Sequence, residues 1–257
     1  MIEVTQLTKS FGDFEALRGV SFQIEPGQVC GYLGPNGAGK STTVRMLMGL
    51  LRPTSGSAQV AGFDVVEQPL EVKRRVGYVP ETAKVFSTLT CEEYLTLVGT
   101  LHDVAADQID TRMRELLKLF QIHESRTKPL ETFSKGMKQK VVLTAALLHA
   151  PQVLIFDEPL SGLDVNAVGT VKELIRQMAN DGKTVFYSSH VLDVVERLCD
   201  RVLILSNGEL VADGSPRSLI DAHQGQTLEQ VFQRYLDIQS QQADVASFVN
   251  RLRPKLN

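Results

Sequence analysis

One octapeptide constrains the fold of this chain more than any other feature. Residues 34–41 read Gly-Pro-Asn-Gly-Ala-Gly-Lys-Ser and match the pattern G-x-x-x-x-G-K-[ST] at every fixed position. The apolar run at residues 29–33 precedes it, as in a buried parallel strand. Apolar residues at helical spacing follow, from Val44 to Leu51, before Pro53. A strand, a glycine-rich loop and a helix in succession predict an α/β fold.

The loop has the chemistry of a phosphate-binding site. Glycines let backbone N–H groups turn inward and approach an anion, and the following helix N-terminus adds partial positive charge. Lys40 is expected to reach the β- and γ-phosphates, and the Ser41 hydroxyl to ligate Mg²⁺. A chance glycine-rich turn does not explain the flanking strand and helix, and a dinucleotide fold requires G-x-G-x-x-G spacing. The predicted nucleotide-contacting residues here are Gly34, Asn36, Gly37, Ala38, Gly39, Lys40, Ser41 and Thr42.

Further strand and helix patterns complete the predicted architecture. Alternating residues 2–4 and 20–24 predict half-buried antiparallel strands, and apolar runs predict strands at 76–79, 153–156, 184–187 and 202–205. Asn207-Gly208 predicts a hairpin turn. The fold class is therefore α/β, a P-loop NTPase core with a mostly parallel sheet, an N-terminal antiparallel β subdomain and an inserted helical lobe at about 85–150.

The C-terminal part has a different pattern. Thr227 with Gln230 predicts a capping box before apolar residues at helical spacing, and residues 243–252 predict one more helix. We expect one domain over residues 1–215 and a C-terminal helical extension over 216–257.

Composition limits the classes of function. No window holds about 18 consecutive apolar residues, and the start, Met1-Ile2-Glu3-Val4, lacks a secretion-signal pattern. The formal net charge of −3 does not favour a nucleic-acid partner. The three cysteines show no metal-ligand spacing and suit a reducing compartment. Both the composition and the start of the chain point to the cytosol.

A second site element lies at the end of the strand predicted at 153–156. Asp157 and Glu158 follow it directly, where a phosphate-binding sheet places an acid that holds Mg²⁺ through water. Glu158 is expected to polarise the attacking water, which is general-base work worth about 10²–10⁴ in rate. Alone, the pair would serve equally well as solvated acids, but the phosphate loop favours catalysis.

Three further segments identify a family. They are Phe133-Ser134-Lys135-Gly136-Met137, Ser161-Gly162-Leu163-Asp164 and Ser188-Ser189-His190. Together with the phosphate loop and the acid pair, they resemble the ATP-binding cassette (ABC) transporter family over about residues 2–215.

The resemblance implies a role for each matching residue. Ser134 and Gly136 look like the signature segment, whose helix start faces the γ-phosphate held by an opposite subunit. Asp164 resembles the acid that crosses the dimer interface, and His190 the switch histidine that senses the γ-phosphate. Phe11 sits where the family stacks an aromatic ring on adenine.

This sequence departs from the family pattern at two places. The signature is usually Leu-Ser-Gly-Gly-Gln, whereas Phe133, Lys135 and Met137 stand at three of these positions. Glu81 lies where the family often has a glutamine, and is expected to join Ser41 and Asp157 around Mg²⁺. Both departures look like those of exporter-type members.

The resemblance implies an ATPase subunit that uses ATP and Mg²⁺, dimerises around ATP and drives a separate transmembrane permease at the cytoplasmic face of the membrane. An apolar groove for the permease is expected among Tyr78, Val85, Phe86, Leu89 and Tyr94, although a core role suits them equally. The cargo and the choice between homodimer and heterodimer stay open. The alternatives are a soluble cassette ATPase of DNA repair or translation, a small-molecule kinase, and a non-catalytic nucleotide-gated subunit.

Overall fold

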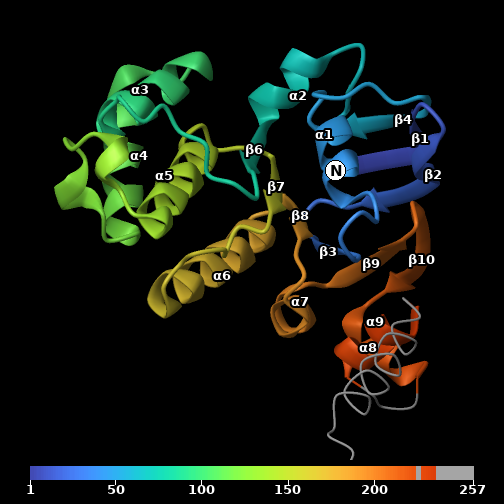
Figure 1. Ribbon diagram of the computed structural model, residues 1–257. Coiled ribbons are helices and arrows are strands. Elements are labelled where there is room, and N and C mark those ends of the chain that lie inside the picture. Colours follow the sequence, from blue (N-terminus) through green and yellow to red (C-terminus); the bar gives the residue numbers. More distant parts are fainter. Residues whose placement is uncertain (224–226, 236–257) are drawn as a thin grey trace, which may run out of the picture.

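The N-terminal region forms a small antiparallel sheet. The structure, a computed structural model, describes residues 1–223 and 227–235 of the 257-residue chain. This sheet has the order β2-β1-β4-β5 and lies at the right in Figure 1. Its strands are β1 (Ile2–Phe11), β2 (Phe14–Ile24), β4 (Ser55–Val60) and β5 (Phe63–Asp64). The predicted N-terminal antiparallel β subdomain is confirmed.

A six-stranded sheet forms the centre, in the order β10-β9-β3-β8-β7-β6. Every neighbouring pair is parallel except β9 with β10. Asn207 and Gly208 make the turn between those two, both with positive φ as a two-residue hairpin requires. The strands are β3 (Val29–Leu33), β6 (Val76–Val79), β7 (Val153–Asp157), β8 (Thr184–Ser188), β9 (Arg201–Ser206) and β10 (Glu209–Gly214). The predicted α/β fold with a mostly parallel sheet is confirmed.

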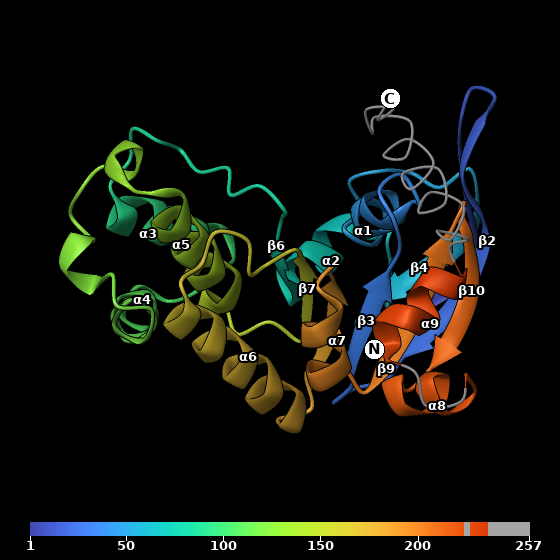
Figure 2. The same ribbon diagram turned by 60° about the horizontal axis from the view of Figure 1, so that its bottom comes forward.

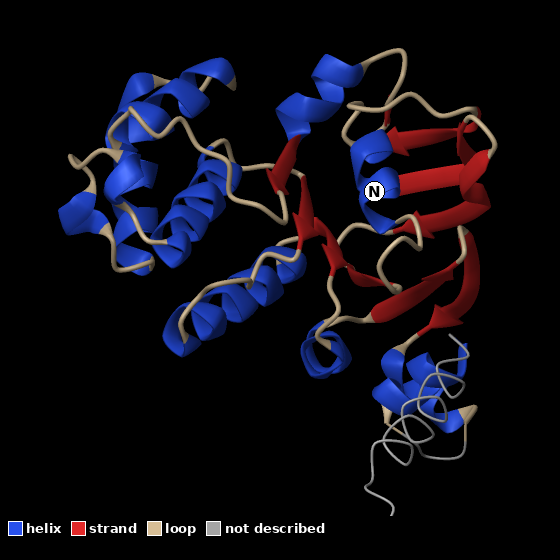
Figure 3. Ribbon diagram, in the orientation of Figure 1, coloured by secondary structure: helices blue, strands red, loops and turns tan. Residues whose placement is uncertain are grey.

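The helices fall into separate groups (Figures 1 and 3). Three of them, α3, α4 and α5, gather in a lobe beside the β6 edge. The helices are α1 (Lys40–Leu47), α2 (Pro69–Arg75), α3 (Cys91–Leu101), α4 (Ala106–Leu119), α5 (Lys135–Leu148), α6 (Val165–Asn180), α7 (Leu192–Leu198), α8 (Pro216–Asp221) and α9 (Leu228–Tyr235). None of these described helices is long and apolar enough to cross a membrane.

The central sheet separates two hydrophobic cores. Val29 and Leu33 of β3 belong to the core shared with α5, α6, α7 and α9. Cys30 and Tyr32, which alternate with them, belong to the core shared with α1 and the N-terminal sheet. This alternation follows from the two-residue period of a strand. Burial on both faces explains why the strand reads as an uninterrupted apolar run.

Some boundaries differ from the expectations. The helix after the phosphate loop ends at Leu47 rather than near Pro53, because Gly49 takes a φ of 60° that continues no right-handed helix. The capping box of Thr227 and Gln230 is present before α9. The helix expected at 243–252 lies outside the described residues. The domain limits at 85–150 and 215 stay predictions.

Candidate nucleotide-binding site

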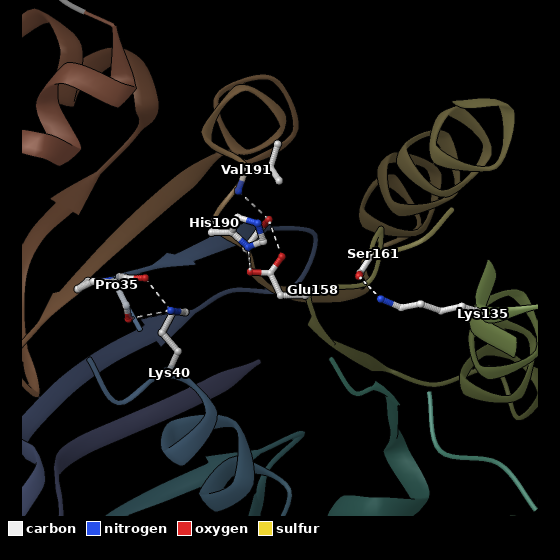
Figure 4. Close-up of polar contacts among 9 residues, drawn as sticks. Pro35, Lys40, Lys135, Glu158, Ser161, His190 and Val191 are labelled. Atoms are coloured by element: carbon white, nitrogen blue, oxygen red, sulfur yellow. Dashed lines mark hydrogen bonds and ion pairs between the residues drawn. The ribbon is translucent and has the colours of Figure 1, made fainter. Parts of the chain in front are cut away.

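The phosphate loop joins β3 to α1 and curls around the Lys40 ammonium. Lys40 Nζ donates to the carbonyl oxygens of Gly34 at 2.6 Å and Pro35 at 3.0 Å (Figure 4). Gly39 has a φ of 111°, and a Cβ there would lie 2.6 Å from the Ala16 carbonyl oxygen. Only glycine therefore fits this position, immediately before the first residue of α1.

The loop opens into a cavity of about 670 Å³. Its walls come from the β1–β2 hairpin, the phosphate loop, the segments that follow β6, β7 and β8, and α9. The lining residues are Phe11, Phe14, Ala16, Gly34, Pro35, Asn36, Gly37, Gly39, Lys40, Ser41, Thr42, Glu81, Asp157, Glu158, His190 and Phe232. Most of the predicted nucleotide and metal residues therefore share one cavity of ligand size.

The two acids at the end of β7 are held by the end of β8. The backbone N–H of Glu158 donates to the Ser188 carbonyl oxygen at 3.0 Å. Ser189 Oγ donates to Glu158 Oε2 at 3.2 Å, and His190 Nδ1 lies 2.6 Å from Glu158 Oε1. Figure 4 shows the carboxylate of Glu158 turned toward His190. The Glu158 side chain is only 14% exposed, whereas that of His190 is 76% exposed.

The site holds partly buried side chains of opposite charge close to one another. Burial lowers the pKa of the Lys40 ammonium, while Glu158, Asp157 and Glu81 act to raise it. Burial raises the pKa of the Asp157 carboxyl, whereas the neighbouring Ser188 side chain and the charge of Lys40 act to lower it. Three acids beside one partly buried lysine are arranged to bind a cation and a polyanion together.

The remaining predicted residues lie on other elements. Ser134 caps α5 by accepting from the Met137 N–H at 3.2 Å, and Asp164 caps α6 by accepting from the Ala167 N–H at 2.8 Å. Neither Ser134, Gly136 nor Asp164 is among the residues that line the cavity. Ala38 is buried beneath the loop, with its N–H bonded to the Pro35 carbonyl oxygen.

Lysines join the two capped helix starts. Lys140 Nζ donates to Asp164 Oδ2 at 2.8 Å. Lys135, one of the departures from the family pattern, donates to Ser161 Oγ at 3.3 Å (Figure 4). Its side-chain carbons also lie over Gly162. A Cβ on Gly136 would lie 2.6 Å from the Gly162 carbonyl oxygen. The starts of α5 and α6 therefore form one closely packed unit.

The structure adds lining residues that sequence reasoning missed. Phe14 is 62% exposed in the same hairpin as Phe11, which is 50% exposed. Two aromatic residues around the Gly12 turn were a visible signal for Phe14. Phe232 comes from α9, and no sequence pattern connects it with the phosphate loop.

A second cavity of about 340 Å³ lies between β6 and the helical lobe. Of the residues expected to form a groove there, Tyr78 and Tyr94 line it, whereas Val85, Phe86 and Leu89 do not. The 63% exposed Phe86 lies beside Tyr94, with ring centroids 6.3 Å apart. The rest of the lining is Met48, Lys73, Val76, Pro80, Lys84, Val98, His102, Val142, Ala145, Ala146 and His149.

Comparisons with known proteins agree with this geometry. The sequence model of the family described as "ABC transporter" matches residues 17–161. The chain is 38% identical to the ABC transporter ATP-binding protein NatA of Bacillus subtilis (strain 168), covering 90% of this chain and 96% of that one. It is 36% identical to the Nod factor export ATP-binding protein I of Rhizobium meliloti (strain 1021), covering 86% of this chain and 66% of that one.

A solved structure of an ATP-binding subunit of an ABC transporter is similar throughout. The TM-score is 0.87 at 31% sequence identity, and the match covers 91% of this chain and 99% of the other. The family predicted from the phosphate loop, the acid pair and the signature segment is therefore confirmed, as are ATP binding and ATPase activity. The chain belongs to the ABC transporter family, as the ATP-binding and ATP-hydrolysing subunit of a transporter.

Proposed function

We propose that this chain binds ATP with Mg²⁺ in the cavity at the phosphate loop, and that two subunits close on the nucleotide to drive a transmembrane permease. One observation carries the proposal. The cavity contains Lys40, Asp157, Glu158 and His190, whereas Ser134 and Gly136 open a helix outside it. The site is therefore complete for binding and for activating water, but lacks its second set of phosphate-binding groups.

The residues present fit a magnesium ion. Mg²⁺ is usually bound by one or two carboxylates, a few waters and the phosphates of a substrate, rather than by a dedicated cage. Ser41, Asp157 and Glu81 supply a hydroxyl and two carboxylates to the same cavity. Mg²⁺ at these groups would neutralise charge on the β- and γ-phosphates.

Lys40 and the loop then hold the phosphates. The inward-facing backbone of residues 34–39 and the N-terminus of α1 attract an anion, and the Lys40 ammonium supplies the full charge. Since Lys40 contacts only two loop carbonyl oxygens among the described residues, it can exchange these for phosphate oxygens without breaking an ion pair.

Glu158 is the general base. Its carboxylate is fixed by Ser189 and His190, so it presents an oriented, mostly buried oxygen to a water in line with the γ-phosphate. His190 is largely exposed on the cavity side and can donate a hydrogen bond to the γ-phosphate. The Glu158–His190 contact thereby links the base to the group that senses the phosphate.

The start of α5 is the contribution of a second subunit. A helix N-terminus capped by an exposed serine suits a phosphate, and α5 carries no acidic residue in its first turn. The contacts of Lys135 and Lys140 with residues 161–164 support movement of both segments as one body onto a partner's nucleotide.

The transmembrane partner is proposed to dock at the cavity between β6 and the helical lobe, beside Tyr78 and Tyr94. This places the chain at the cytoplasmic face of the membrane, bound through the permease. Export is the proposed direction, because a relative at 36% identity is named for Nod factor export.

The test is the substitution Glu158→Gln, with Glu115→Gln on the exposed face of α4 as the matched control. The amide keeps the size of the side chain but cannot take a proton, so hydrolysis should fall by roughly 10²–10⁴ while ATP still binds. Size-exclusion chromatography with ATP should then show accumulated dimers. Normal turnover in Glu158→Gln would refute the assigned base.

A mixing experiment tests the contribution of the second subunit. Lys40→Ala and Ser134→Ala each impair both sites of their own dimers. In a mixed dimer of the two variants, one site combines an intact phosphate loop with an intact signature helix, so part of the ATPase activity should return. No recovery in a proven mixed dimer would contradict the two-subunit site.

A further inference from the structure

The described part of the C-terminal extension lies against the nucleotide-binding core. Figure 2 shows α9 in front of β9 and close to α7, the helix that follows His190. Leu228 and Val231 are fully buried in the core shared with α7 and β9. The backbone N–H of Leu228 donates to Glu196 Oε2 of α7 at 3.4 Å. This packing fixes the position of α9 relative to the sheet.

One side chain of α9 reaches the nucleotide cavity. Residues 228, 231, 232 and 235 recur at intervals of three and four, and so form one helix face. Leu228 and Val231 are the fully buried part of this face, while Phe232 is only partly buried and lines the cavity. Phe232 thus stands at the border between the core and the site.

The phenyl ring of Phe232 suits the base and ribose end of a nucleotide. The polar groups of the cavity come from the phosphate loop, the end of β7 and the segments that follow β6, β7 and β8, whereas its aromatic groups are Phe11, Phe14 and Phe232. A phenyl ring has no group that binds a phosphate, but it packs on a base or on the apolar face of a ribose. Phe11 and Phe14 come from the β1–β2 hairpin, so Phe232 is the aromatic contribution of the opposite end of the chain.

We infer that Phe232 contacts the adenosine part of the bound nucleotide, as an aromatic wall that the C-terminal extension supplies to the site. Its proposed role is substrate binding, because it would contact the nucleotide far from the phosphates that react. The inference rests on the proposed function, since it needs ATP in this cavity. It also makes α9 responsive to the nucleotide, because a ligand that packs on Phe232 stabilises the helix where it is.

Calorimetric titrations of the full-length chain with ADP and with pyrophosphate separate the two ends of the nucleotide, and neither ligand needs hydrolysis to be blocked. In Phe232→Ala, the Kd for ADP should rise at least about fivefold, since loss of base stacking on one ring corresponds to about 1 kcal/mol or more. The Kd for pyrophosphate should stay within about twofold of the wild-type value.

Matched variants distinguish a contact from a packing effect. Phe232→Tyr keeps the ring and should bind ADP almost as wild type does. Phe232→Leu keeps apolar volume without the ring, and is measured if the alanine variant does not fold. It should still weaken ADP more than pyrophosphate. Tyr235→Leu changes an aromatic residue on the same helix face that is not among the cavity-lining residues, and should leave both affinities unchanged.

Hydrogen exchange gives a second readout. ADP should increase amide protection in residues 228–235 of the wild type, and pyrophosphate should not. The inference would be wrong if the Phe232 variants bound ADP and pyrophosphate equally more weakly, or if Tyr235→Leu lost as much ADP affinity. Phe232 would then serve only to pack the core. Unchanged ADP affinity in Phe232→Leu would also overturn the inference while leaving the proposed function intact. Failure of wild-type protein to bind either ligand would instead refute the proposed function.

Discussion

The largely buried imidazole of His149 should make this chain lose stability in mild acid. His149 follows α5 and stacks on His102, with ring centroids 3.8 Å apart. Its Nε2 lies 3.2 Å from the Val76 carbonyl oxygen, and its Nδ1 has no partner among the described residues. Burial lowers the pKa of His149 from 6.5 to about 4, and the charges of His102 and Arg112 add to this.

The sign follows from comparing the folded and unfolded chains. Between about pH 4 and 6.5, an unfolded His149 binds a proton and a folded one does not, so unfolding is favoured as the pH falls. The contribution that the neutral His149 makes to the free energy of unfolding is fully present above about pH 6.5 and is lost as the pH falls toward 4. At 1.36 kcal/mol per pKa unit, the loss between pH 7.5 and 5.0 is about 2 kcal/mol. Burial also lowers the pKa of His102, which acts in the same direction.

The surroundings offer little to oppose this effect. Lys73 and Lys84 line the same cavity as the two rings, and both carry positive charge. On the other side, a shallower pocket that His102 and His149 also line contains Glu71 and Asp103, together with Arg74 and Arg75. Arg74 pairs with both of these acids and Arg75 pairs with Glu71, so two guanidinium charges offset the two carboxylates.

Urea unfolding at pH 7.5 and 5.0 measures the prediction in wild type and His149→Gln. Glutamine keeps an N–H donor for the Val76 carbonyl oxygen but does not titrate. The variant should therefore lose about 2 kcal/mol less than wild type between the two pH values. His123→Gln controls for removal of a histidine elsewhere in the lobe. Equal losses in wild type and His149→Gln would refute the reasoning.

Two further substitutions test the phosphate loop and the lobe. Lys40→Ala should weaken ATP binding, because it removes the only lysine or arginine among the described residues that line the cavity. Unchanged affinity for a fluorescent ATP analogue would count against the phosphate loop. Thr90→Ala should destabilise the lobe by about 1 kcal/mol, since Thr90 and Glu93 form a reciprocal capping box at the start of α3, and a urea midpoint equal to that of wild type would contradict this.

The central strands could be predicted because their burial on both faces requires a continuous apolar run in the sequence. The structure has β6 at Val76–Val79 as expected. β7 and β8 extend the expected ranges by one residue at one end, and β9 extends its range by one residue at each end. In contrast, β4 (Ser55–Val60) has only two buried residues among six, so it carries no apolar run. The start of α3 was readable from Thr90 and Glu93 but was missed within the helical stretch.

The residues of the candidate site also differ in whether a local sequence pattern predicts them. The phosphate loop and the acid pair are each a continuous stretch of sequence, so the residue types and spacing within each predict its chemistry directly. Phe232 and the stacked His102 and His149 depend on packing between distant segments, for which a single sequence has no spacing rule. The loop aromatic Phe14 lies between these cases, because it has the right residue type beside a turn but no fixed position in a motif.

The two acids also show why a strand pattern alone does not fix a site. Successive side chains of a strand point to opposite faces, so Asp157 and Glu158 in regular continuation could not serve one cavity. Glu158 instead takes a φ of 52°, which is rare for a residue with a side chain and costs about 1–3 kcal/mol. The bond from its N–H to Ser188 and the side-chain contacts with Ser189 and His190 hold this conformation. The turn brings both carboxylates to the same cavity, so the backbone strain lies at the residue that we propose as the general base.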